Sequence, residues 1–182
     1  THFLKEGGTW VWQYPQTPMV YDILALTDGN FAGYFAGYSF NATTRLGSTT
    51  YGYNATPGIN GVYNFSTNSG PVLTIYDAGG TDTLDLSGDT LTTSNSVTYD
   101  VNGAATFSEI TRTTSVIDLR PGNYSSTNGM TNNIGIAFGT IIENAIGTNF
   151  NDTIYGNNFA NTLYGRDGAD SIFGGLGADF ID

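Results

Sequence analysis

The C-terminal stretch Gly147–Asp182 reads GTNFNDTIY, GNNFANTLY, GRDGADSIF and GGLGADFID when it is divided into nines. Each unit is a turn that ends in an acid or an amide, followed by three residues typical of a β-strand. The closing residues of the turns are Asp152, Asn161, Asp170 and Asp179, and the middle residues of the strands are Ile154, Leu163, Ile172 and Ile181. An aliphatic residue kept in register in every unit indicates a folded internal repeat.

The residue types of this unit fit a stack of coils held by metal ions. In so short a strand only the middle side chain points inward, and Gly and Asn tolerate the positive φ of tight turns. Two units make one coil, so each turn stacks on the turn two units later. A hard cation takes about six to eight oxygens, and two carbonyls plus one closing side chain from each turn supply about six. The pattern predicts a calcium-binding parallel β-roll, with a metal-free solenoid or a linker as the alternative.

The composition limits the possible partners. The chain has 182 residues and a formal net charge of −11, with only five Lys and Arg residues. This balance argues against nucleic acid and anionic membranes and favours divalent cations. Cysteine is absent, so no disulfide can stabilise the fold, and bound metal is the expected stabiliser of a secreted domain. We expect no membrane insertion and no signal peptide in this stretch, and we interpret the chain as a fragment of a longer protein.

The pattern along the chain predicts an all-β protein with one short N-terminal helix. Residues 1–16 have an irregular, aromatic-rich pattern, and Thr17–Thr27 has a helical one, with Thr17 as N-cap and Pro18 next. A partner-binding helix is the alternative there. Short runs then follow that are typical of strands, namely Thr49–Tyr53, Val62–Phe65, Val72–Tyr76, Thr83–Leu86, Val97–Val101, Ser115–Leu119 and Ile134–Phe138.

Four blocks carry a resemblance to a known family. They are YPQTPMVYDILAL from Tyr14, TTRLGSTTYGYN from Thr43, YDAGGTDTLDLSG from Tyr76 and IENAIGTNFNDTIYGNN from Ile142. With the repeat, they resemble the C-terminal region of serralysin-type proteases, which are secreted bacterial zinc endopeptidases of the metzincin class with RTX calcium-binding repeats. The resemblance covers residues 14–182 and is weak at 28–44 and 88–133. It implies a β-sandwich continuing into the parallel β-roll.

The resemblance also implies a division of the chain. Residues 1–30 correspond to the end of a protease domain with its last helix, 31–140 to the β-sandwich, and 141–182 to the RTX roll, which forms one compact unit with 31–140. A metzincin site needs H-E-x-x-H-x-x-G-x-x-H, and the only histidine of this chain is His2. No catalytic residue is therefore assigned, and Zn²⁺ is expected only in a catalytic domain missing from this chain.

The family's calcium ligands map onto two groups of residues, many of which act through main-chain oxygens. In the roll, Thr148, Phe150 and Asp152 are expected to share an ion with Gly165, Asp167 and Asp170, and Asn157, Phe159 and Asn161 with Gly174, Leu176 and Asp179. Before the roll, Arg45, Gly47 and Thr49 are expected to meet Asp77, Gly79 and Asp82, and Gly80 and Asp82 to share an adjoining site with Ile141 and Glu143. Ile141 stands where the family commonly has Thr, so it offers only its main-chain oxygen.

These observations favour a non-catalytic, calcium-binding C-terminal module of a secreted serralysin-like zinc metalloendopeptidase. The resemblance implies that it stabilises the protease domain and supports type I export from a bacterium. A calcium-dependent adhesin or surface-layer module is one alternative. The repeat tail of a polysaccharide-modifying enzyme, such as an alginate epimerase, is another. The block beginning at Tyr14 favours the protease, because it matches the end of a protease domain.

Overall fold

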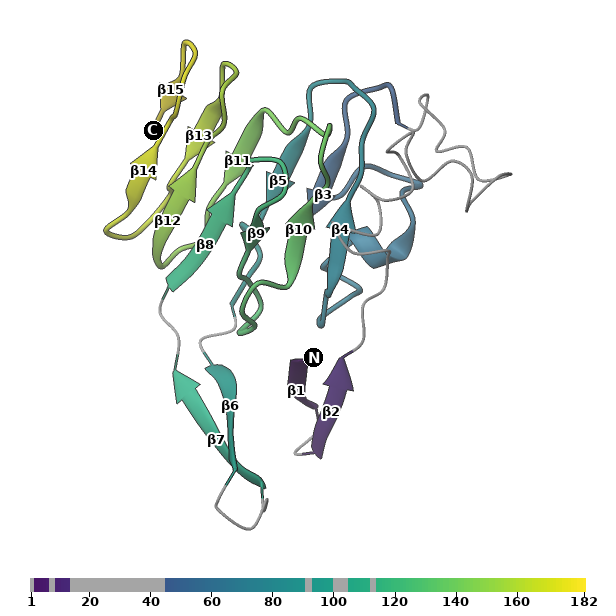
Figure 1. Cartoon of the computed structure of the whole chain (residues 1–182), viewed down its shortest axis with the longest axis vertical. Coiled ribbons are helices and arrows are strands. Elements are labelled where there is room, and N and C mark those ends of the chain that lie inside the picture. Colours follow the sequence, from purple (N-terminus) through teal and green to yellow (C-terminus); the bar gives the residue numbers. More distant parts are fainter. Residues whose placement is uncertain (1, 7–8, 14–44, 91–92, 100–104, 112–113) are drawn as a thin grey trace, which may run out of the picture.

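Short strands in two facing layers form the body of the molecule (Figure 1). The structure, a computed structural model, describes residues 2–6, 9–13, 45–90, 93–99, 105–111 and 114–182. The first layer is a parallel five-strand sheet in the order β15-β13-β11-β5-β3. Its strands are β3 (Thr50–Gly52), β5 (Thr83–Asp85), β11 (Asn144–Ile146), β13 (Thr162–Tyr164) and β15 (Phe180–Ile181).

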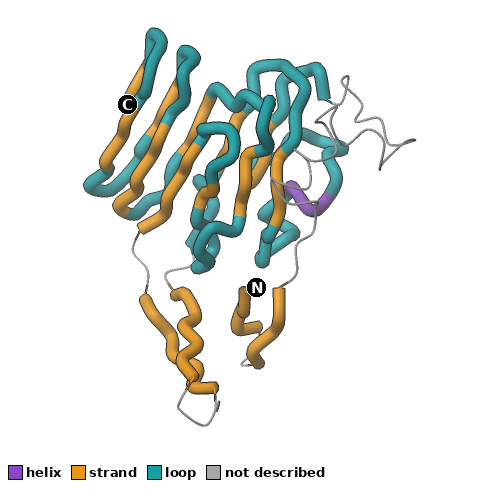
Figure 2. Tube along the Cα trace, in the orientation of Figure 1, coloured by secondary structure: helices purple, strands orange, loops and turns teal. Residues whose placement is uncertain are grey.

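The second layer consists of two three-strand sheets laid side by side. Parallel strands β14 (Ser171–Phe173), β12 (Asn151–Tyr155) and β8 (Thr114–Asp118) form one of them. In the other, β10 (Ile134–Ile136) pairs parallel with β4 (Leu73–Ile75) and antiparallel with β9 (Tyr124–Ser125). An isolated bridge between Val116 and Ser126 connects the two sheets. Figure 2 shows the loops that join successive strands from β11 to β15, which alternate between the two layers.

The apolar core lies between the layers and follows the strand register. Tyr51, Leu84, Ala145 and Leu163 are aligned on neighbouring strands of the five-strand sheet, and all four are fully buried. Ile117 and Ile154 are aligned in the same way on the facing layer. The four positions of the five-strand sheet are the middle residues of three-residue strands, as the inward-pointing pattern requires. The buried row runs from Leu84 through Ala145 to Leu163 without a break, so the sandwich and the roll share one apolar core.

The coil period of the repeat is confirmed by the pairing of the strands. Thr153 pairs with Ser171 and Leu163 with Ile181, so each strand stacks on the strand two units later. The expected fold class, a β-sandwich that continues into a parallel β-roll, is therefore what the structure shows. The last coil differs from the others in burial, because Ile181 is 49% exposed whereas Leu163 is fully buried.

One expected strand is a helical turn instead. Gly61–Tyr63 forms a 3₁₀ helix, η2, in the stretch Val62–Phe65 that was predicted to be a strand. The Asn60 side chain accepts a hydrogen bond from the Val62 N–H, which caps the turn at its N-terminus. Local capping by Asn therefore outweighs the β-propensity of Val and Tyr. The helix expected at Thr17–Thr27 lies outside the described residues.

Two antiparallel hairpins are further differences from the sequence prediction. Strands β1 (His2–Glu6) and β2 (Thr9–Gln13) pair in the segment predicted to be irregular. Strands β6 (Thr93–Tyr99) and β7 (Ala105–Thr111) pair where only Val97–Val101 was predicted. The Gly-Gly pair at 7–8 is a hairpin signal that would have found the first one. Within the described residues, no helix has the length and apolar character needed to cross a membrane.

Candidate calcium sites

The turns that lead into the parallel strands stack in two columns. Five of them lead into the five-strand sheet, and we call these the five-turn column; they end at Thr49, Asp82, Glu143, Asn161 and Asp179. Two more precede β12 and β14, and we call these the two-turn column; their closing residues are Asp152, the second residue of β12, and Asp170. Each gap between successive turns is named below by its two closing residues.

The closing side chain of a turn reaches back across the gap to the preceding turn. In the Thr49–Asp82 gap, Asp82 Oδ1 accepts a hydrogen bond from the Thr49 N–H at 2.8 Å. In the Asp82–Glu143 gap, Glu143 Oε2 accepts one from the Asp82 N–H at 2.7 Å. These contacts bring together residues far apart in sequence, so the carboxylates before the roll lie between stacked turns.

The roll repeats this arrangement one coil at a time. Asp170 Oδ1 accepts a hydrogen bond from the Asp152 N–H at 2.8 Å, and Asp179 Oδ1 accepts one from the Asn161 N–H at 2.9 Å. Both contacts join residues eighteen positions apart. The structure thus places Asp152 against Asp170 and Asn161 against Asp179, which are the two pairs that the sequence predicted to share an ion.

Glycines let the backbones of stacked turns approach each other. Gly168 has φ +134°, and a Cβ there would lie 2.6 Å from the Phe150 carbonyl oxygen. Gly177 has φ +117°, and a Cβ there would lie 2.7 Å from the Phe159 carbonyl oxygen. The peptide groups of Phe150 and Phe159, two of the predicted ligands, therefore lie directly against the facing turn. A side chain at either glycine would occupy the gap itself.

The same close approach occurs before the roll. A Cβ on Gly80, which has φ +140°, would lie 2.7 Å from the Gly47 carbonyl oxygen. The Arg45 guanidinium donates to the Tyr76 carbonyl and lies 4.7 Å from the centre of the Tyr63 ring. It therefore cannot point its charge into the gap at the same time. Arg45 and Gly47 meet the turn that contains Asp77, Gly79 and Asp82, which is the expected grouping.

Asp82 lacks a partner that a cation would supply. Its side chain is fully buried, and Oδ2 is buried with no hydrogen-bond donor among the described residues. Burial raises the pKa of Asp82 to about 7, and the carboxylates of Asp77 and Glu143 act in the same direction. A buried carboxylate with one unpaired oxygen is costly. A calcium ion beside Oδ2 would remove that cost, so the residues present fit the metal.

Asp77 and Asp152 are held by their own neighbours. The Tyr51 hydroxyl donates to Asp77 Oδ2. Desolvation raises the pKa of Tyr51, and the hydrogen bond to Asp77 raises it further. Asp152 accepts hydrogen bonds from the Thr148 N–H at 2.6 Å and from the Ser115 N–H at 3.3 Å. Burial raises the pKa of Asp152, and nearby Asp170 adds to it. The contact with Ser115 joins the roll to β8, and the sequence analysis did not anticipate it.

The remaining predicted ligands lie in the turns, where most of them would act through main-chain oxygens. They are Gly165, Asp167, Gly174, Leu176, Asn157 and Ile141. The Asn157 carbonyl accepts a hydrogen bond from the Leu176 N–H at 3.1 Å across the Asn161–Asp179 gap. Within the described residues, no group of three or more His, Cys, Asp and Glu side chains converges on one point. Backbone carbonyls therefore have to supply much of each coordination shell.

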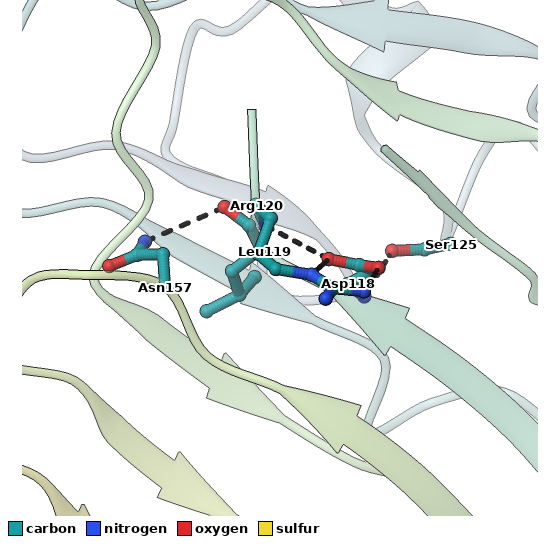
Figure 3. A network of polar contacts seen from close by, with 5 residues as sticks. All are labelled: Asp118, Leu119, Arg120, Ser125 and Asn157. Atoms are coloured by element: carbon teal, nitrogen blue, oxygen red, sulfur yellow. Dashed lines mark hydrogen bonds and ion pairs between the residues drawn. The ribbon is translucent and has the colours of Figure 1, made fainter. Parts of the chain in front are cut away.

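Figure 3 shows a polar network that positions the connection after β8. Asp118 binds Arg120 through the guanidinium, with an oxygen–nitrogen distance of 2.6 Å, and its backbone N–H donates to Ser125 Oγ at 2.9 Å. The Arg120 guanidinium also lies 4.8 Å from the centre of the Tyr155 ring. This network fixes the Leu119 carbonyl, which faces the Asn157 side chain.

Comparisons with known proteins match two parts of the chain to known families. Residues 146–181 match the family described as RTX calcium-binding nonapeptide repeat (4 copies), and residues 40–98 match the one described as Peptidase M10 serralysin C terminal. The chain is 35% identical over 151 residues to "Serralysin" of Proteus mirabilis and 34% identical over 150 residues to "Serralysin B" of Dickeya chrysanthemi. It is 34% identical over 153 residues to "Metalloprotease AprA" of Pseudomonas entomophila (strain L48).

These matches are extensive in this chain and partial in the relatives. They cover 83%, 82% and 84% of this chain respectively, but 25% of each relative. The chain thus spans about a quarter of the length of the curated relatives that it matches.

Proposed function

The chain is a serralysin-type C-terminal region that carries RTX calcium-binding repeats, and on this premise we propose that it is a calcium-dependent folding module of a longer secreted protease. Calcium binding and the stacking of turns would be one event, because neither turn of a gap holds a full set of ligands. The observation that carries the proposal is Asp82 Oδ2, buried between stacked turns with no donor among the described residues.

We assign an ion to each of four gaps. The proposed ligands come from the turns that face each other across the Thr49–Asp82, Asp82–Glu143, Asp152–Asp170 and Asn161–Asp179 gaps. Each of these gaps holds at least one carboxylate that bonds back to the preceding turn. Carboxylates, amide oxygens and carbonyls are the ligands that calcium prefers. Zinc chemistry would belong to a separate catalytic domain, because the described turns offer oxygen ligands and the sequence has one histidine.

We further propose how the chain is divided. Residues 1–30 would be the end of the protease domain, 31–140 the sandwich and 141–182 the roll. The sandwich and the roll would act as one unit, since β11 pairs with β5 on one side and with β13 on the other. A rigid unit of this kind would stabilise the protease domain that precedes it. The protease names of the relatives favour this interpretation over an adhesin or a polysaccharide-modifying enzyme.

We propose that the protein folds outside a bacterial cell after type I export. Extracellular calcium modules bind with dissociation constants of roughly 10⁻⁴–10⁻³ M. Free calcium at that level is available outside the cell. A chain with a net charge of −11 would remain extended by self-repulsion until the ions bind. The higher concentration of free calcium outside the cell would therefore allow the chain to fold there and not inside.

The proposal is tested by removing calcium from the purified chain. We expect excess EGTA to abolish most of the β-sheet circular dichroism and to lower the melting temperature, and added calcium to restore both. EGTA already saturated with calcium is the control. An unchanged spectrum and melting temperature in EGTA would contradict the proposal. We also expect the chain alone to cleave no casein, and cleavage by material shown pure by mass spectrometry would contradict the division of roles.

A further inference from the structure

The Glu143–Asn161 gap differs from the other gaps of the five-turn column. Its closing side chain, Asn161, is an amide, whereas the other closing side chains that reach back across a gap in this column are carboxylates. Asn161 Nδ2 donates to the Glu143 carbonyl oxygen at 3.0 Å. The direction of the hydrogen bond across this gap is therefore reversed, with the side chain donating and the preceding turn accepting.

A second amide crosses the same gap. Asn157 Nδ2 donates to the Ile142 carbonyl oxygen at 2.8 Å, and also approaches the Leu119 carbonyl oxygen at 3.5 Å (Figure 3). Asn157 and Asn161 are 4% and 2% exposed. Two buried N–H donors thus satisfy the carbonyl oxygens that would otherwise face a cation.

The orientation of both amides follows from their other contacts. Asn161 Oδ1 accepts the Asn157 N–H at 2.8 Å, and Asn157 Oδ1 accepts the Phe159 N–H at 2.9 Å. Turning either amide over would set its nitrogen against an N–H group and its oxygen against a carbonyl. A cation in this gap would face the amide hydrogens of both side chains, which repel positive charge.

We propose that Asn157 and Asn161 replace a calcium ion in the Glu143–Asn161 gap. The roll is then joined to the sandwich by hydrogen bonds, and calcium acts on either side of this junction. The inference rests on the proposed function only because it compares this gap with the other gaps, which we propose hold calcium. It means that, in the folded chain, amide hydrogen bonds close this step of the stack in place of an ion and position the next turn for the ion in the Asn161–Asp179 gap.

The test restores the residue types that the last turn has at these two positions. N157G/N161D places Gly and Asp where Gly175 and Asp179 stand one coil later. We expect this variant to bind one more calcium ion per chain than the wild type in equilibrium dialysis with metal analysis. We also expect its melting temperature to rise more steeply with the logarithm of calcium concentration, because one more ion is released on unfolding.

A matched control changes charge alone. In N64D the new carboxylate can keep the hydrogen bond that Asn64 Oδ1 accepts from the Ser66 N–H, away from every gap. We expect N64D to bind as many ions as the wild type. An unchanged calcium count in N157G/N161D, or an equal increase in N64D, would overturn the proposal.

A crystal of the wild-type chain soaked with terbium tests the same point without a variant. We expect anomalous density in the Asn161–Asp179 gap and none in the Glu143–Asn161 gap. Density between the Ile142 and Glu143 carbonyls would overturn the amide junction. Absence of density in all gaps would instead contradict the proposed function, so the two failures are distinguishable.

Discussion

Asp82 is the residue through which we propose that folding is coupled to calcium. It is fully buried on the turn before β5, with Asp77 and Glu143 close enough to add to the rise in pKa that burial causes. Oδ1 is bonded to the Thr49 N–H, and Oδ2 has no donor among the described residues. Without calcium this oxygen destabilises the fold, and in the proposed site calcium would bind it. On this proposal the sign of its contribution depends on the metal.

We expect D82N to change stability in opposite directions with and without calcium. Without calcium, loss of the buried charge beside Asp77 and Glu143 outweighs the amide nitrogen left without an acceptor, so the calcium-free state should gain about 1 kcal/mol of stability. With calcium, the gap loses a charged ligand and its affinity should fall by about tenfold or more. Thermal unfolding in EGTA and across a calcium titration measures both effects.

The control for this variant is D85N. Asp85 is also buried, in β5, but it accepts its hydrogen bonds from Asn54 and Ser87 and lies outside the gaps. D85N should leave the calcium count and the calcium midpoint unchanged. Equal stability losses for D82N in EGTA and in calcium would show that Asp82 has only a structural role.

Among the elements, the turns were easier to predict than their contacts. The nonapeptide period predicted which residues close each turn and that turns two units apart would meet, and the strand register agrees. It did not predict that each closing side chain would reach toward the preceding turn. Nor did it predict the donor role of Asn157, because an amide can donate or accept and its surroundings decide which.

Elements outside the repeat were predicted less well. The stretch Gly61–Tyr63 contains residues of high β-propensity, yet a single Asn cap makes it helical. The hairpins β1–β2 and β6–β7 lie outside the nonapeptide period, and turn chemistry is the main sequence signal for them. Hydrogen bonds between side chains such as Asn60 and the nearby backbone compete with strand formation, and composition or periodicity gives little sign of them.

The turn glycines should be intolerant of any side chain. We expect G168A to lower the free energy of unfolding in saturating calcium by about 1–3 kcal/mol, because alanine is strained at φ +134° and its Cβ would press on the Phe150 carbonyl oxygen. The affinity of the Asp152–Asp170 gap should fall as well. Calcium titration calorimetry and thermal unfolding measure the two quantities.

Gly61 provides the comparison for this substitution. A Cβ at Gly61 would meet no neighbouring atom within 4 Å, and the φ of this glycine is not left-handed. G61A should change the free energy of unfolding by no more than about 0.5 kcal/mol. A G168A variant as stable as G61A, with unchanged calcium affinity, would mean that the two turns are further apart than the structure shows.

Across the molecule, burial falls from the sandwich to the last coil. The middle residues Tyr51, Leu84 and Leu163 are fully buried, whereas Ile181 is 49% exposed. Phe173 and Phe180 on the same coil are also more than half exposed. The sandwich supplies a conventional apolar core, and the last coil has little of one. Metal binding should therefore matter most for order at the C-terminal end.

This gradient predicts that the last coil opens first. The Asn144 N–H donates to the Asp82 carbonyl and the Phe180 N–H to the Asn161 carbonyl, at equivalent positions of two gaps. In limiting calcium we expect Phe180 to exchange its amide hydrogen about fivefold faster than Asn144, since about half of one aliphatic side chain, roughly 1 kcal/mol, is missing from its packing. Hydrogen exchange followed by NMR resolves the two amides.

A pair of core substitutions separates weak packing from weak metal binding. L163A should cost about 2–5 kcal/mol, as expected for a fully buried aliphatic residue. I181A should cost about half of that or less, because half of its surface is already in water. Raising calcium should slow exchange at Phe180 toward the rate at Asn144. If this slowing is as large in I181A as in the wild type, the ion in the Asn161–Asp179 gap stabilises the last coil. If I181A abolishes that slowing, side-chain packing holds the coil, and the metal only follows it.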